Sequence, residues 1–438
     1  MPSIDANPPS GTRDFLPGEA SRRERVFTTI RQVFARHGFD PLDTPAFERL
    51  DVLTGKYGEE GDQLIFKILR RGEHEASGDA DLALRYDLTV PLARVAARYG
   101  SQLPTPFKRF QIAPVWRADR PGHGRFREFF QCDVDTVGTD SLLADAATID
   151  AVTDVLRHLG LTGFRVQVNS RKALAGLIEA YGVPAALESE ALTALDKLDK
   201  IGVDGVAAEL VDRGMPEPSV DALVADLGGG DLAAAVRDRL ADNERGAAGL
   251  AEVDRLLGLL DDGSGVVYAP VLARGLSYYT GPVFEVVHDD LDVTIAAGGR
   301  YDGLIGMFQA VDVPATGGSL GIERILLLLE AAEEERRRGP DVVVTVMGDD
   351  PDADADAASL ARRVREGGYD VDLYTGGGSR KLGKQLRYAD RRGARLALLR
   401  GVEERAAGTV TVKHLASGEQ ATIGLDDLAD HLGRVLDA

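Results

Sequence analysis

The chain has a single cysteine, Cys132, and a single tryptophan, Trp116, among its 438 residues. One cysteine excludes an intramolecular disulfide framework and is typical of a protein in a reducing compartment. No run of about eighteen apolar residues is present, so we expect no membrane span. The N-terminus from Met1 to Gly18 is polar and contains prolines, without the apolar centre of a secretion signal. We therefore expect a cytoplasmic protein in which Cys132 is a packed thiol rather than a nucleophile.

Lysine is also scarce. The 51 basic residues comprise 9 lysines and 42 arginines, against 71 acidic residues, which gives a formal net charge of −20. This charge argues against a nucleic-acid partner, because phosphate binding favours a basic surface. Arginine, however, is the better phosphate ligand of the two cations. An acidic, lysine-poor surface suits a protein that works in high salt; codon bias of the host is the alternative.

Two segments combine an arginine, tyrosines and closely spaced glycines. Residues 272–281 read LARGLSYYTG and residues 297–304 read AGGRYDGL. Glycine lets the backbone approach a ligand closely, and the arginine fork donates to phosphate oxygens. Together the segments predict a pocket for a small polar molecule and a phosphate. Either segment alone is equally compatible with a plain hairpin that packs a tyrosine.

A third segment, residues 107–135, alternates aromatic and polar residues on both sides of the sequence PGHG. This pattern predicts two strands joined by a loop. Strand alternation sends Gln131, Asp133 and Asp135 to one face, with Phe129 beside them. The predicted face thus carries an amide and carboxylates next to an arginine-rich loop, as a site for an amino acid and an adenylate requires.

With these segments, the chain resembles the histidyl-tRNA synthetases, a class II aminoacyl-tRNA synthetase family, over nearly its whole length. Segments 38–48, 116–135 and 314–324 resemble class II motifs 1, 2 and 3. Segments 272–281 and 298–304 resemble the two histidine-specific motifs, and segment 84–91 resembles the one that holds the substrate's amino group. The resemblance implies an α+β catalytic domain with an antiparallel sheet, a helical insertion and a C-terminal α/β anticodon-binding-like domain. Motif 1 builds the dimer interface in this class, which implies a homodimer.

The implied activity is that of a histidine–tRNA ligase, which converts L-histidine and ATP to histidyl-adenylate and transfers histidine to tRNA(His). Mg²⁺ is expected with the ATP, and no metal ligand in the chain is predicted. The catalytic residues implied are Arg117 and Arg274. The implied histidine-binding residues are Asp87, Thr89, Gln131, Asp135, Tyr278 and Tyr279, and the implied ATP-binding residues are Arg117, Asp119, Arg125, Phe129 and Arg324.

Within this set, Asp135 and Tyr279 are expected to take the two imidazole nitrogens. Asp87, Thr89 and Gln131 are expected to hold the ammonium group. Ser277 departs from the family, which usually has aspartate there. We interpret Ser277 as a change behind the contact residues, one that could still weaken the orientation of Arg274.

The expected boundaries place the catalytic domain at residues 1–170 and 263–332, the insertion at 171–262 and the anticodon-binding domain at 341–438. Capping signals predict a helix from Ser21 to His37 and another from Ser379 to Arg392. On the latter, the spacing predicts one shared basic face, formed by Arg380, Lys384, Arg387 and Arg391. We expect this face to contact tRNA; a solvated helix face is the alternative. The insertion lies over the tRNA acceptor arm in the family, and a purely structural insertion is the alternative.

Two rival interpretations share the domain pattern. One is a regulatory paralogue that controls an ATP phosphoribosyltransferase, and the other is a non-catalytic RNA-binding protein. Such regulatory relatives typically lack the last domain and the ATP-binding arginines. Because this chain has that domain together with Arg117, Arg274 and Arg324, the ligase is favoured.

Overall fold

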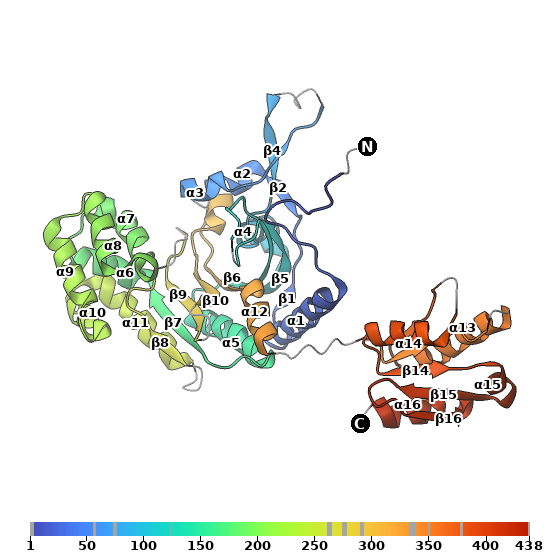
Figure 1. Ribbon diagram of the computed structural model, residues 1–438. Coiled ribbons are helices and arrows are strands. Elements are labelled where there is room, and N and C mark those ends of the chain that lie inside the picture. The colour runs from blue at the N-terminus through green and yellow to red at the C-terminus, as the bar shows by residue number, and fades with distance from the viewer. Residues whose placement is uncertain are drawn as a thin grey trace. The chain divides into compact units, whose positions relative to one another are not determined.

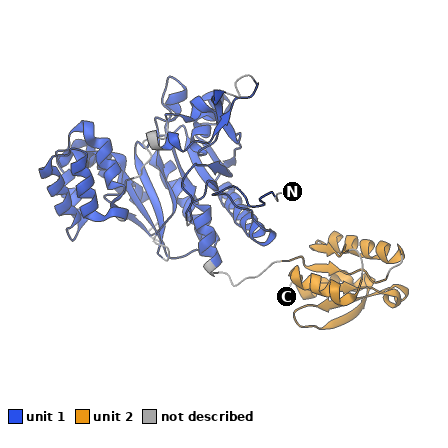
Figure 2. Ribbon diagram, turned by 45° about the horizontal axis from the view of Figure 1, so that its top comes forward, with its two compact units in different colours: residues 1–332 blue, residues 333–438 orange. Residues whose placement is uncertain are grey.

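The computed structural model describes residues 4–436, with gaps at 56–57, 73–76, 123, 261–264, 274–277, 290–292, 333–338, 349–350 and 377–379. The chain forms two compact units, residues 1–332 and 333–438 (Figure 2). In the described residues, no helix is both long and apolar enough to cross a membrane.

The described residues of the first unit contain an eight-stranded sheet (Figure 1). Its order is β1 (Asp40–Pro41), β5 (Phe107–Trp116), β6 (Glu128–Val137), β11 (Ala315–Leu320), β10 (Val293–Arg300), β9 (Pro282–His288), β7 (Phe164–Ser170) and β8 (Val266–Tyr268). The edge pairs β1–β5 and β7–β8 are parallel, and the inner pairs are antiparallel. The expected antiparallel catalytic sheet is thus confirmed.

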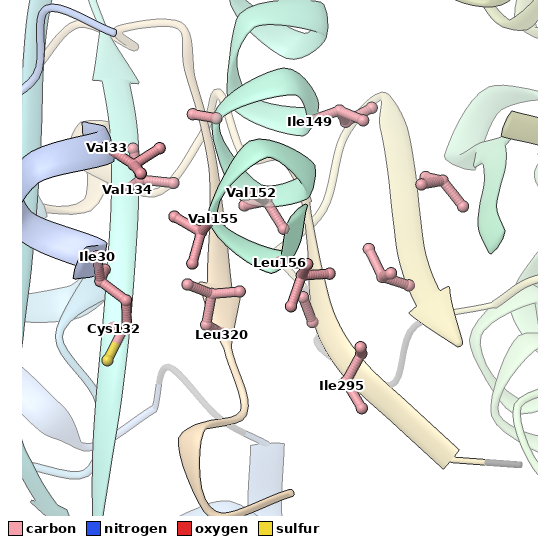
Figure 3. Packing of buried hydrophobic residues seen from close by; sticks show 14 of the residues in the cluster. Ile30, Val33, Cys132, Val134, Ile149, Val152, Val155, Leu156, Ile295 and Leu320 are labelled. Carbon is pink, nitrogen blue, oxygen red and sulfur yellow. The ribbon is translucent and has the colours of Figure 1, made fainter. Parts of the chain in front are cut away.

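One face of this sheet is apolar and carries the core (Figure 3). Helices α1 (Pro17–Arg36), α5 (Leu142–His158) and α12 (Ile322–Ala332) pack against its strands. Cys132 is fully buried there, and burial raises the pKa of its thiol well above the usual value. The predicted start of the first helix at Ser21 is wrong, because α1 begins at Pro17. Proline suits a first helical turn, since its φ is already helical and no N–H is lost from the hydrogen-bond ladder.

Elements on the opposite side of the sheet include a small sheet with the order β2 (Phe47–Arg49), β4 (Ala80–Leu84), β3 (Lys67–Leu69). Helices α2 (Leu50–Leu53), α3 (Gly58–Gln63) and α4 (Thr89–Tyr99) accompany it, with the short helices η2 (Gly100–Gln102) and η5 (Ile305–Phe308). A second apolar cluster joins α2 and α4 to Tyr279 and Tyr301. Segments far apart in the sequence therefore meet on the face of the large sheet that lies opposite the apolar core.

The insertion is helical, as predicted, and has its own core. It contains α6 (Arg171–Ala180), η3 (Ala185–Leu187), α7 (Glu188–Leu195), α8 (Leu198–Asp212), α9 (Glu217–Leu227), α10 (Leu232–Leu240) and α11 (Glu244–Leu259). Helices α6 and α11 approach so closely that a Cβ at Gly176 would overlap the backbone of Gly246. Since α6 follows β7 without a linker, the insertion starts directly at the sheet.

In the described residues of the second unit, a mixed five-stranded sheet has the order β13 (Val371–Leu373), β12 (Val342–Val344), β14 (Leu396–Leu399), β15 (Thr409–His414) and β16 (Gln420–Gly424). The first three strands are parallel and the last two pairings are antiparallel. The helices are α13 (Pro351–Glu366), α14 (Leu382–Arg391), α15 (Val402–Ala407), η6 (Leu425–Asp427) and α16 (Leu428–Leu436). This mixed α/β layer confirms the predicted architecture.

Candidate active site

The polar face of the large sheet is built by strand register. On β6, Asp133 pairs with Gln111 on β5 and with Ser319 on β11. Asp135 pairs with Arg109 on β5 and with Gly317 on β11. Residues that face each other across a ladder share a side of the sheet, and neighbours along a strand alternate. Cys132 and Val134 therefore enter the core while Gln131, Asp133 and Asp135 face the other way. The predicted common face of these three residues is confirmed.

A buried ion pair lies at the centre of this face. Nη2 of Arg109 is 2.8 Å from Oδ2 of Asp135, with side-chain exposures of 0% and 3%, and it donates to the Leu88 carbonyl at 3.1 Å. The Tyr301 hydroxyl donates to Oδ1 of Asp135 at 2.5 Å. A Cβ at Gly317 would overlap that same oxygen. Contacts from three separate segments thus hold the Asp135 carboxylate in one position.

Asp133, the next acidic residue on the same face, is less well paired. Its side chain accepts a hydrogen bond from Ser319, and burial raises its pKa to about 7, opposed by Arg109 and reinforced by Asp135 and Asp87. Among the described residues, Oδ1 of Asp133 and Oε1 of Gln131 have no hydrogen-bond partner. Buried polar atoms are normally paired. These two acceptor oxygens are therefore available to a hydrogen-bond donor that the described residues do not supply.

Asp87 and three tyrosines border the same face. Asp87 is buried, and its Oδ1 accepts the N–H of Val90 at 3.1 Å in the first turn of α4. The rings of Tyr278 and Tyr279 are 5.0 Å apart, and those of Tyr278 and Tyr301 are 6.0 Å apart. Burial, with the negative charges of Asp87 and Asp133, raises the pKa of Tyr278 well above its usual value. Tyr278 is therefore protonated at neutral pH and able to donate a hydrogen bond.

Arg117 brings positive charge to the end of β5. Its Nε donates to the Tyr86 carbonyl at 3.1 Å, and its guanidinium lies 4.4 Å from the Tyr86 ring centre and 5.1 Å from that of Phe129. Stacking on two aromatic rings fixes the plane of a guanidinium and leaves its edge for an anion. Arginine in this setting suits a phosphate or a carboxylate.

The other arginines predicted to bind phosphate lie around this end of the sheet. Arg125 is exposed, 3.8 Å from Asp119, and Arg324 on α12 donates to the Thr294 carbonyl at 2.5 Å. The backbone N–H of Gly321, just before α12, donates to the Ile295 carbonyl. Arg274 and Ser277 lie outside the described residues.

Two residues that contact Asp135 were not assigned to the site from the sequence. The sequence analysis gave no role to Arg109 or Tyr301, because the neighbouring sequence of neither residue indicates that it contacts Asp135. Arg300, in the expected pocket segment, is instead a buried partner of Asp145 and donates to the Thr139 carbonyl at 3.1 Å. Its contacts fix the start of the segment that carries Tyr301. Cross-strand register is the signal that would have found Arg109.

The basic face in the second unit is partly different from the prediction. Lys384, Arg387 and Arg391 are exposed on or at the end of α14. Arg380 precedes the helix and pairs with Asp354 at 2.8 Å, so its predicted place on the shared helix face is wrong. The predicted first helical residue, Ser379, lies outside the described residues.

The comparisons with known proteins agree with this arrangement. Residues 11–325 match the histidyl-tRNA synthetase family and residues 341–434 match the anticodon binding domain family. Histidine–tRNA ligases of Cytophaga hutchinsonii and Aeropyrum pernix are each 40% identical to the chain. The alignments cover 97% of this chain and 98% of the first relative, and 98% of both chains for the second.

Solved structures extend the match. A histidyl-tRNA synthetase from Nostoc sp. PCC 7120 superposes with a TM-score of 0.82 at 30% identity, covering 99% of this chain and 100% of the other. A Bacillus halodurans protein described as an ATP phosphoribosyltransferase regulatory subunit/histidyl-tRNA synthetase gives a TM-score of 0.73 at 25% identity, covering 90% and 98%.

Proposed function

Because this chain belongs to the histidyl-tRNA synthetase family, we propose that it activates L-histidine with ATP and transfers the histidyl group to tRNA(His). One observation carries the proposal: a single sheet face holds the buried carboxylates of Asp133 and Asp135 and, beside it, an arginine that lies over two aromatic rings. The carboxylates suit a cationic, hydrogen-bonding amino acid. The stacked arginine suits the phosphate to which that amino acid becomes joined.

In the first step, the histidine carboxylate attacks the α-phosphorus of ATP and pyrophosphate leaves. Such a step depends on positioning and on cations near the phosphate oxygens rather than on covalent help from the protein. Arg117 and Arg274 bind the reacting carboxylate and α-phosphate. Arg125 and Arg324 hold the phosphate chain, while Phe129 stacks on adenine and Asp119 contacts its amino edge.

Mg²⁺, bound together with ATP, would neutralise charge on the phosphates. The described residues contain no cluster of three or more histidine, cysteine or acidic side chains suited to a metal ion. Mg²⁺ bound with ATP would take phosphate oxygens and water as most of its ligands, as it prefers in nucleotide sites.

Histidine selection follows from the hydrogen-bond inventory of imidazole, which has two distinct nitrogens. Asp135 accepts from one nitrogen, and Tyr279 contacts the other. Asp87, Thr89 and Gln131 hold the ammonium group. A site that pairs every polar atom of the correct substrate rejects others strongly, since a wrong side chain leaves buried groups unpaired.

The second step needs the tRNA. We assign Lys384, Arg387 and Arg391 on α14 to contacts with tRNA phosphates, since all three are exposed cations on an acidic protein. The chain acts as a homodimer through segment 38–48, within which Phe47, the first residue of β2, is 52% exposed. Its single buried cysteine suits the cytoplasm.

Histidine-dependent exchange of pyrophosphate into ATP tests the activity. We expect exchange with histidine alone among the amino acids, and an Arg117→Ala variant that is slower by roughly 10²- to 10³-fold, as for other lost contacts to developing charge. Arg98→Ala, an exposed arginine on α4, is the control. Histidine binding by folded protein without exchange would instead support the regulatory paralogue.

A further inference from the structure

The buried charges on the polar face do not balance within the described residues. Asp133 and Asp135 are each 2% exposed, and the pKa of Asp133 is raised by burial and by the neighbouring carboxylate of Asp135. Arg109 is the fully buried cation among them. Buried carboxylates need a compensating positive charge or a proton. A cationic ligand would supply the missing charge.

The contacts on this face leave Asp133 available for such a ligand. Oδ2 of Asp135 is in the ion pair with Arg109 and Oδ1 accepts from Tyr301. Oδ1 of Asp133, by contrast, has no hydrogen-bond partner among the described residues, and neither has Oε1 of Gln131. Nε and Nη1 of Arg109 are also unpartnered, but they are donors and cannot bind a cation.

The spacing along β6 fits the two ends of an amino acid. Residues two apart on a strand point the same way and stand roughly 6.5–7 Å apart. Asp133 thus lies midway between Gln131, assigned above to the ammonium group, and Asp135, assigned to the ring. Asp87, which is assigned to the ammonium group together with Thr89 and Gln131, is close enough to raise the pKa of Asp133.

We propose that Asp133 binds the ammonium group of the amino-acid substrate directly, sharing it with Gln131 and leaving Asp135 to the imidazole. This assignment rests on the proposed function and adds a substrate ligand to it. An ammonium group carries three donors; the two unpartnered oxygens of Asp133 and Gln131 take two of them, and the third is left to Asp87 and Thr89. The groups that face Asp133 are Arg109 on β5, Asp135 on β6, Ser319 on β11, Asp87 before α4, and Tyr278.

The test compares two ligands that differ in the ammonium group, histidine and imidazolepropionate, by calorimetry on the full chain. Asp133→Asn keeps the side-chain shape and removes the charge. We expect it to weaken histidine about ten- to hundredfold, as for a lost hydrogen bond between charged groups. Imidazolepropionate and ATP should bind to the variant as they do to the unmodified protein.

Asp140→Asn, an exposed acid three residues beyond β6, is the matched control and should leave all three affinities unchanged. Equal weakening of histidine and imidazolepropionate, or unchanged histidine binding, overturns the assignment of Asp133 while the proposed activity stands. Unmodified protein that binds no histidine overturns both. Asp133→Ser gives the same comparison if the asparagine variant does not fold.

Discussion

Asp133 should make the unliganded protein less stable as the pH rises. An unfolded aspartate has a pKa of about 3.9, whereas burial raises that of Asp133 to about 7 in the folded chain. Between these values the folded state binds more protons than the unfolded state, so stability falls with increasing pH. Three pKa units at 1.36 kcal/mol each amount to about 4 kcal/mol, lost between about pH 4 and pH 7.

Asp133→Asn removes this titration. Without ligand, we expect the variant to match the unmodified protein near pH 4 and to exceed its stability by about 4 kcal/mol at pH 8. Urea unfolding of the first unit, followed by near-ultraviolet circular dichroism at several pH values, measures the difference. Asp140→Asn, which changes the same charge at an exposed position, should stay within about 0.5 kcal/mol at every pH. A stability gain that is equal at pH 4 and pH 8 would refute the reasoning.

Two further substitutions address other parts of the site. Gly317→Ala places a Cβ on Oδ1 of Asp135, so we expect a loss of about 1–3 kcal/mol in stability and a raised KM for histidine with the KM for ATP unchanged. Gly258→Ala, where a Cβ meets nothing within 4 Å, is its control, and an unchanged histidine KM would contradict the role of Asp135. Arg387→Ala should weaken tRNA binding and lower the salt slope of log K by roughly 0.7–0.9. Arg362 on α13 is also exposed. If Arg362→Ala weakens tRNA binding as much as Arg387→Ala does, α14 is not a specific contact site for tRNA.

The sequence was informative where the signal was local. Alternation along β6 predicted which face Gln131 and Asp135 share, because side-chain direction in a strand depends on its period alone. The partners of Asp135 could not be predicted from the sequence. Tyr301 is 166 residues away, and Arg109 lies opposite Asp135 only through the register of β5 and β6. Helix α1 was misplaced by a serine that resembled a cap, because proline four residues earlier begins the helix equally well.

The strict alternation of β6 also limits which changes of length the gene can accept. Deleting one residue within the strand would turn Asp133 and Asp135 into the apolar core and bring Cys132 and Val134 out among the polar groups. The β5–β6 ladder ends at the pair Trp116 and Glu128, so a change of length in the connection, residues 117–127, would not reverse the two faces of β6. Length variation among relatives should therefore be absent from β6.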